Sequence, residues 1–102
     1  MENYVRVAEA EELGPGSKMF VREGGTAILL VNVDGQIYAV SNSCTHSRCH
    51  LHQGKLKGKV IICACHFAEF DVTTGAVLSG PAKRPLPTYP VKLEGKDLWV
   101  AV

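Results

Sequence analysis

The sequence predicts a small all-β protein, folded as an antiparallel sandwich or a partly closed barrel. Short apolar or alternating segments recur along its 102 residues, and turns rich in glycine and proline separate them. The longest apolar run, residues 27–31, is typical of a buried strand, and Asp34-Gly35 shortly after it is a strong hairpin signal. Only residues 9–13 suit a helical turn, which Gly14-Pro15-Gly16 would end.

Apolar residues mark four strands in the amino-terminal half. Val5 and Val7 alternate with polar neighbours, which is the two-residue period of a strand with one buried face. Gly24-Gly25 would end the second strand, and Asp34-Gly35 would join the third and fourth. The expected strands are residues 5–7, 19–21, 27–33 and 36–40.

The carboxy-terminal half continues the same pattern with five further strands. Turn signals lie at Thr74-Gly75 and at residues 94–97. Residues 80–90 contain four prolines, which predicts a stiff surface loop. The expected strands are residues 59–63, 70–72, 76–78, 89–93 and 98–102.

The composition gives no support for binding to nucleic acid or to a membrane. The net charge is +1, and the lysines and arginines form no basic run. No segment approaches the ~20 apolar residues of a membrane span, and the first residues lack the regions of a signal peptide. We therefore expect one compact domain, residues 1–102, in the cytoplasm. A domain of this size gains noticeable stability from a bound metal or a crosslink.

Two short motifs carry the chemistry of the chain. Cys44-Thr45-His46 and Cys63-Ala64-Cys65-His66 each place a thiolate and an imidazole within one turn of backbone, and sixteen residues separate them. Two cysteines and two histidines can hold a tetrahedral zinc ion. They can also hold a two-iron cluster with both cysteines on one iron and both histidines on the other. The donor set alone leaves both possibilities open.

The two motifs at this spacing resemble the ligand pattern of Rieske [2Fe–2S] proteins. The likeness continues through residues 66–71, Thr74-Gly75 and the proline-rich residues 80–91, and it covers nearly the whole chain. It is strongest to the small Rieske ferredoxins of ring-hydroxylating dioxygenase systems. The resemblance implies a Rieske-like antiparallel sandwich or partly open barrel. It also implies a cluster-binding subdomain of two loops at approximately residues 42–82.

The same resemblance implies the cofactor, the ligands and the partners. Cys44 and Cys63 would hold the inner iron of a [2Fe–2S] cluster, and His46 and His66 would hold the outer iron near the surface. The protein would be a one-electron carrier and not an enzyme in its own right. It would take electrons from a flavin-dependent ferredoxin reductase and pass them to a terminal oxygenase. The alternatives are an electron-transfer subunit of a nitrite reductase or a monooxygenase, and a zinc-stabilised interaction module.

Cys49 and Cys65 depart from the pattern of dioxygenase ferredoxins, which generally lack both. Rieske proteins of cytochrome bc complexes carry cysteines at the same offsets, where they form a disulfide between the two cluster loops. The resemblance therefore implies a Cys49–Cys65 disulfide. Two free thiols are the alternative, because disulfides are rare in the cytosol.

A further departure predicts a low reduction potential. High-potential Rieske proteins carry a serine two residues after the last histidine ligand and a tyrosine four residues after it, and both hydroxyls donate hydrogen bonds to sulfur. Ala68 and Phe70 occupy these positions here and have no hydroxyl. We therefore expect a potential in the lower part of the Rieske range of about −150 to +300 mV.

Partners are expected to dock at the edge that carries His46 and His66, because electron transfer needs a short path to the outer iron. The near-zero net charge favours a small interface with an apolar centre. His50 and His52 are interpreted as solvent-exposed loop histidines and not as a second metal site. The expected rim of the docking surface is Arg48, Leu51, Phe67 and Pro81.

Overall fold

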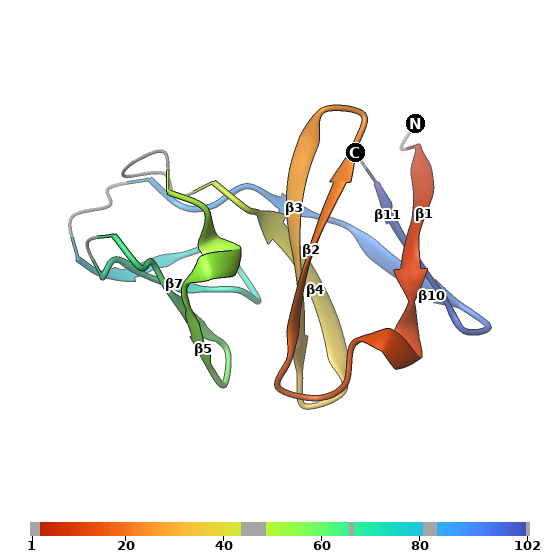
Figure 1. The fold of residues 1–102 in the computed structure, drawn as a ribbon, viewed down its shortest axis with the longest axis horizontal. Helices are drawn as coiled ribbons and strands as arrows, with labels where there is room; N and C mark the ends of the chain where they lie inside the picture. The colour runs from red at the N-terminus through yellow and green to blue at the C-terminus, as the bar shows by residue number, and fades with distance from the viewer. Residues whose placement is uncertain (1–2, 44–48, 66, 81–83, 102) are drawn as a thin grey trace.

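Three antiparallel sheets make up the fold of the described part of the chain. The structure is a computed structural model, and it describes residues 3–43, 49–65, 67–80 and 84–101. Within these residues the regular structure is eleven strands and two single 3₁₀ turns, which confirms the all-β prediction. Figure 1 shows one sheet in the centre and a further sheet on each side of it. Among the described residues, no helix has the length and apolar character needed to cross a membrane.

The longest strand of the fold lies in the central sheet and is buried on both faces. The strands of this sheet are β2 (Lys18–Glu23), β3 (Thr26–Val33), β4 (Gln36–Ser41) and β9 (Thr88–Tyr89), in the order β2-β3-β4-β9. Along β3, Leu29 and Val31 belong to one core cluster, whereas Ile28 and Leu30 belong to another. Successive side chains point to opposite faces of a strand, so burial on both faces explains the continuous apolar run.

The β3–β4 hairpin confirms the turn that was predicted from the sequence. Asp34 has a φ of 52° and Gly35 a φ of 93°, which is the pair of positive values that a two-residue type I′ turn requires. The side chain of buried Asn32 reinforces the turn, because its Oδ1 accepts a hydrogen bond of 2.7 Å from the Gly35 amide.

The first outer sheet joins the two ends of the chain. It contains β1 (Tyr4–Glu9), β10 (Val91–Glu94) and β11 (Asp97–Ala101), with β11 in the middle. The 3₁₀ turn η1 (Ala10–Glu12) follows β1, as the sequence predicts. This sheet and one face of the central sheet enclose a core cluster that consists of Ala8, Leu13, Ile28, Leu30, Ala39, Leu98 and Val100.

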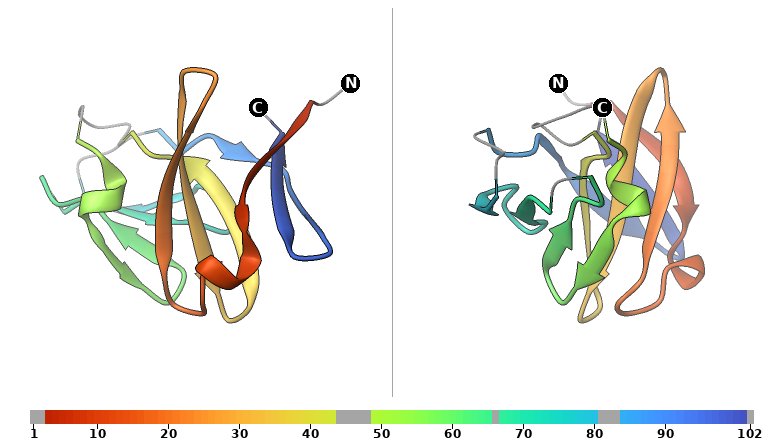
Figure 2. Two further views of the ribbon diagram at one scale, coloured as in Figure 1. Left: turned by 45° about the vertical axis from the view of Figure 1, so that its right-hand side comes forward. Right: turned by 60° about the vertical axis from the view of Figure 1, so that its left-hand side comes forward.

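The second outer sheet lies on the other side of the central sheet (Figure 2). It contains β5 (Lys55–Lys57), β6 (Val60–Ile62), β7 (Glu69–Asp71) and β8 (Val77–Ser79), paired in chain order. The 3₁₀ turn η2 (Leu51–Gln53) precedes it. The core cluster on this side consists of Leu29, Val31, Val40, Leu51, Ile61, Cys63, Ala68, Phe70, Val72 and Leu86.

The predicted strand at residues 89–93 is wrong, because the chain changes sheets at Pro90. Thr88–Tyr89 pairs with β4 in the central sheet, whereas Val91–Glu94 pairs with β11 in the outer sheet. Proline has no amide hydrogen to donate to a ladder. Its carbonyl still accepts a hydrogen bond of 3.0 Å from the Ala101 amide, so the crossing point remains tied to the outer sheet.

Asp71, at the end of β7, is a buried carboxylate that organises the following turn. Its Oδ1 accepts hydrogen bonds from the amide (2.8 Å) and the hydroxyl (2.6 Å) of Thr73, and its Oδ2 lies 3.4 Å from the Lys59 ammonium. Burial raises the pKa of Asp71, but the Thr73 hydrogen bonds and the Lys59 charge outweigh it. The net effect lowers the pKa of this carboxyl below its usual value.

This lowered pKa predicts an acid-sensitive contribution to stability. A carboxyl whose pKa is lower in the folded state stabilises the fold above its unfolded-state pKa of ~3.9. That contribution disappears as the pH falls through the folded-state pKa. We therefore expect wild type to unfold at higher urea concentration than Asp71→Asn at pH 6, and this difference should shrink below about pH 4. A difference that stays constant down to pH 2 would contradict the assignment.

Candidate metal centre

The two cysteine–histidine motifs fall in connections that border the second outer sheet. The first lies between β4 and η2, and the second lies between β6 and β7. Of the predicted ligands, the structure describes Cys63; Cys44, His46 and His66 lie outside the described residues. Two predicted docking residues, Arg48 and Pro81, lie outside them as well.

Cys63 is a buried thiol held by a tight backbone loop. It follows β6 directly, its side chain is fully buried, and it is not part of a disulfide. Its amide donates a hydrogen bond of 2.8 Å to the carbonyl of Ala68, and its own carbonyl accepts one of 3.0 Å from the Phe67 amide. A fixed, unpaired thiol fits the role of a thiolate ligand to iron.

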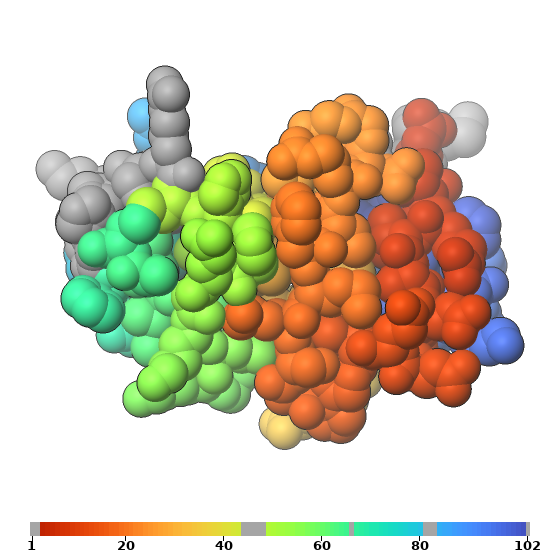
Figure 3. All heavy atoms as spheres, in the orientation of Figure 1, coloured from red at the N-terminus to blue at the C-terminus, as the bar shows by residue number. Residues whose placement is uncertain are grey.

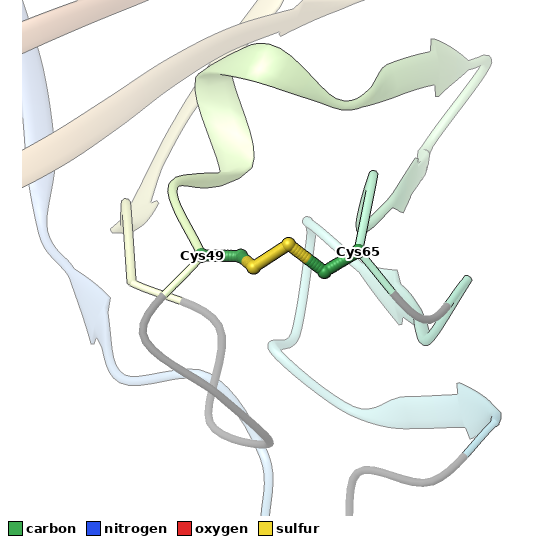
Figure 4. Close-up of a disulfide and its surroundings, with 2 residues drawn as sticks. All are labelled: Cys49 and Cys65. Carbon is green, nitrogen blue, oxygen red and sulfur yellow. A yellow bond between two sulfur atoms is a disulfide. The ribbon is translucent and has the colours of Figure 1, made fainter.

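A disulfide between Cys49 and Cys65 joins the two loops, which confirms that prediction. Figure 4 shows the two side chains pointing toward each other from the segment before η2 and the segment after β6. Their Cα atoms are 6.3 Å apart, and sixteen positions separate the two cysteines in the chain. Such a bridge restrains the denatured chain and contributes up to ~3 kcal/mol in the chain-entropy model.

A cluster of polar contacts around Asn42 fixes the end of the first loop. The Oδ1 atom of Asn42 accepts a hydrogen bond of 2.8 Å from the His52 amide, and its Nδ2 lies 2.8 Å from His52 Nδ1. Since Oδ1 is already used by the amide, Nδ2 donates to Nδ1, which leaves the neutral imidazole proton on Nε2. The Lys18 ammonium donates to the His52 carbonyl, and the His52 ring stacks on Phe20 with centroids 4.8 Å apart.

These contacts attach η2 to the edge of the central sheet, where η2 lies against β2 (Figure 3). The prediction of two solvent-exposed loop histidines is therefore right for His50 and wrong for His52, which is half-buried. The sequence offers one signal, Asn42 directly after an apolar strand, and the structure shows that this asparagine is buried. Its partner ten residues away carries no signal of its own.

The prediction that Leu51 lines the docking rim is wrong. The side chain of Leu51 is fully buried in the core cluster that also contains Cys63. The reason lies in the backbone, because the Leu51 amide donates a hydrogen bond of 2.7 Å to the Asn42 carbonyl as η2 begins. This bond fixes the turn with Leu51 facing the core, and it leaves the preceding His50 exposed.

Phe67 has the expected surface position and an unusual backbone conformation. Its side chain is 72% exposed, the highest value among the large apolar residues that are described, and its φ is 60°. A positive φ is uncommon for any residue with a side chain. Together with Lys55, Lys57 and Ala64, Phe67 borders an open groove of about 450 Å³ that reaches Cys63. The groove combines an apolar side chain with two positive charges next to the second loop.

The proline-rich loop packs against the second cluster loop through Gly80. A Cβ atom at Gly80 would lie 2.6 Å from the Ala68 Cα, and the φ of Gly80 is +90°. Gly35 has a similar φ of +93°, but no atom of the described residues lies within 4 Å of the position that its Cβ would take. A comparison of the two glycines therefore separates conformational strain from steric overlap.

We predict that Gly80→Ala destabilises the protein more than Gly35→Ala. The control should lose ~1–2 kcal/mol through the positive φ, and Gly80→Ala should lose a further ~1–3 kcal/mol through overlap with Ala68. Urea unfolding followed by circular dichroism measures both losses. Equal losses would mean that the two loops are not in contact at this point.

The fold and the described part of the site define a small β protein in which two crosslinked loops bracket a buried thiol. A family model described as the Rieske [2Fe-2S] domain matches residues 3–90. The chain belongs to this family, and its cofactor is a [2Fe–2S] cluster. This cofactor rules out the alternative of a zinc-stabilised interaction module. The cofactor supplies one-electron chemistry when it is bound.

Known proteins resemble the chain over almost its whole length. The biphenyl dioxygenase ferredoxin subunit of Pseudomonas sp. (strain KKS102) is 35% identical over 98 residues, which are 95% of this chain and 90% of that protein. The solved ferredoxin of carbazole 1,9a-dioxygenase from Nocardioides aromaticivorans IC177 is 33% identical, with a TM-score of 0.91 and 96% of each chain covered. A complex of reduced oxygenase and oxidized ferredoxin in carbazole 1,9a-dioxygenase contains a chain with a TM-score of 0.93 and 31% identity, and the match covers 99% of this chain and 94% of that one.

Proposed function

We propose that this chain is a one-electron carrier of a ring-hydroxylating dioxygenase system. It takes electrons from a flavin-dependent ferredoxin reductase and passes them to a terminal oxygenase, in which the bond chemistry takes place. The observation that carries this proposal is the similarity to dioxygenase ferredoxins across nearly the full length of both chains. The solved complex of a ferredoxin with its oxygenase supports the second half of the route.

We propose Cys44, His46, Cys63 and His66 as the ligands of the cluster. The complete pair of motifs supports this set, and so does the burial of the free Cys63 thiol. Neutral imidazoles in place of two thiolates lower the negative charge of the site, which favours electron entry compared with four cysteines. We also propose one Rieske domain over residues 1–102, with residues 42–82 as its cluster-binding part.

We propose that partners dock on the edge around the two histidine ligands, and that Phe67, which was predicted on the rim of this surface, provides its main apolar contact. Arg48 remains in this proposal because it lies two residues after His46 in the sequence, and Pro81 remains because it follows Gly80, which packs against Ala68 in the second loop. The exposure of Phe67 and the lysines of the adjacent groove support a small interface with an apolar centre and a charged rim.

Element analysis and reconstitution with partners test the proposal. Freshly purified protein should contain two irons and two acid-labile sulfides per chain and should be red-brown. It should also support turnover when it is mixed with a flavin-dependent reductase and a terminal oxygenase of the dioxygenase class. Protein with a full cluster that no such oxygenase can oxidise would overturn the proposed route and leave the cofactor assignment intact.

The potential of the cluster provides a further prediction. Ala68 is buried and its carbonyl accepts the Cys63 amide, so a hydroxyl on its Cβ would lie within the second loop. A hydrogen bond to a charged group contributes about 1.5–3 kcal/mol, and 59 mV corresponds to a tenfold change for one electron. Ala68→Ser should therefore raise the midpoint potential by roughly 60 to 130 mV. The exposed control Ala76→Ser should leave it unchanged in the same redox titration. A wild-type midpoint above about +150 mV would contradict the argument.

A further inference from the structure

Three cysteine sulfur atoms lie together at the junction of the two loops. The Sγ atoms of Cys49, Cys63 and Cys65 are all within 4.8 Å of one another. Cys49 and Cys65 form the disulfide, whereas Cys63 is a free and fully buried thiol. A disulfide uses only two of these sulfur atoms. The third sulfur lies close enough to both for the three to bind one metal ion once the disulfide is reduced.

We propose that Cys49, Cys63 and Cys65 form a three-thiolate site for a soft d¹⁰ cation, with zinc as the representative, in cluster-free protein whose disulfide has been reduced. Zinc–sulfur bonds of about 2.3 Å in a tetrahedral site place the sulfur atoms roughly 3.8 Å apart. Sulfur atoms that already lie within 4.8 Å of one another need only small side-chain movements to reach this spacing. Water completes the coordination at the fourth position.

The site becomes available through a balanced two-electron reduction. A dithiol reductant delivers two electrons and two protons to the Cys49–Cys65 bond, which opens into two thiols while the reductant becomes a disulfide. Cys65 is exposed, so a reductant can reach the bond. Zinc then replaces one proton on each of the three thiols as it binds.

The backbone gives the site one fixed ligand and two that can adjust. Cys63 is fixed by hydrogen bonds to Ala68 and from Phe67, and it lies in the core. Cys49 comes from the other loop, so its sulfur can move toward Cys63 once the disulfide opens. While the disulfide is intact, Cys63 is the only thiolate of the three, and a single thiolate is a weak zinc ligand set.

Zinc at this site would interfere with assembly of the cofactor, an inference that rests on the proposed role of Cys63 as a cluster ligand. Zinc bound to the three thiolates would occupy Cys63 and block its use by iron. The disulfide therefore acts as a selectivity device, because it removes two competing thiolates from the neighbourhood of an iron ligand.

Zinc binding to cluster-free, full-length His46→Ala/His66→Ala tests the site, because this variant no longer has the Cys₂His₂ set that could itself hold zinc. One sample keeps its disulfide, and the other is reduced with a phosphine, which contains no thiol and takes the oxygen of water as it reduces the bond. A competing chromogenic chelator measures zinc affinity, and circular dichroism checks the fold. We expect the reduced protein to bind one zinc at least a hundredfold more tightly than the oxidised protein. Equal affinities would overturn the proposal.

Two variants separate this site from the predicted iron ligands. His46→Ala/His66→Ala keeps all three sulfur atoms, and after reduction it should bind zinc as tightly as reduced wild type. Adding Cys49→Ser/Cys65→Ser to this variant removes two of the three sulfur atoms, and it should lose at least a hundredfold in zinc affinity. The opposite pattern would place zinc on the iron ligands and overturn the proposal.

Cadmium binding and cluster reconstitution in the wild-type protein provide two further measurements. Cadmium should give an ultraviolet thiolate charge-transfer band that corresponds to three thiolates in the reduced wild type. Zinc added before iron and sulfide should lower cluster yield more in the reduced wild type than in the oxidised protein. A band that corresponds to two thiolates or fewer, or equal cluster yields, would overturn the proposal. Iron and sulfide in the oxidised protein test the proposed function separately.

Discussion

Replacing Cys63 by serine is expected to leave the protein without its cluster and to destabilise the fold. Serine is a much poorer iron ligand than thiolate, and the side chain is fully buried among apolar residues of the core. Metal binding is coupled to folding, because the unfolded chain has no preformed site. Iron and sulfide should fall from two of each per chain to near zero. The free energy of unfolding should fall by about 4 kcal/mol or more, as is typical when a protein loses a structural metal.

The matched control removes two other cysteines from the same loops. Cys49→Ser/Cys65→Ser eliminates the disulfide but keeps the four predicted ligands. It should retain its iron and its visible spectrum, and it should lose less than ~3 kcal/mol, because the cluster itself already restrains both loops. A full cluster in Cys63→Ser would remove Cys63 from the ligand set. Loss of the cluster from the double variant alone would mean that the disulfide is essential for assembly.

The sequence predicts the strands whose burial follows a simple pattern. In β3 the apolar run and the Asp34-Gly35 turn both point to a buried hairpin, and the structure contains it. The prediction of one strand at residues 89–93 is wrong because the alternation of Tyr89, Val91 and Leu93 does not reveal which sheet each residue joins. Pro90 is the local clue, but the change of sheet depends on pairing with β4 on one side and β11 on the other.

In the site too, the sequence predicts features that follow from a local motif and misses those that depend on residues elsewhere in the sequence. The Cys49–Cys65 disulfide was predicted from offsets shared with another branch of the family, and the structure contains it. The burial of Leu51 and the bonding of His52 both depend on Asn42, which directly follows β4 and lies nine and ten residues earlier in the chain. An apolar or imidazole side chain in a polar loop carries no signal of such a partner. These two residues were therefore placed on the surface by sequence reasoning.

Replacing Phe67 by asparagine is expected to weaken docking to the oxygenase while leaving the cluster and the fold intact. Asparagine adopts positive φ more readily than phenylalanine, so the backbone at φ 60° should tolerate the change. The ring is 72% exposed in the free protein, so its loss removes little of the core. A central aromatic contact at an interface contributes about 2 kcal/mol or more, which corresponds to roughly a 30-fold loss of affinity.

Steady-state turnover with the reductase and oxygenase, at varied concentrations of the carrier, measures this loss directly. Phe67→Asn should lower kcat/KM for the carrier by about 30-fold, mainly through a higher KM, with an unchanged visible spectrum and iron content. Leu93→Asn is the matched control, because Leu93 is 59% exposed on β10, in the sheet on the opposite side of the central sheet (Figure 1). It removes a similar exposed apolar side chain and should leave kcat/KM unchanged. If Leu93→Asn impairs turnover and Phe67→Asn does not, the docking surface lies on the far outer sheet and not beside the cluster loops.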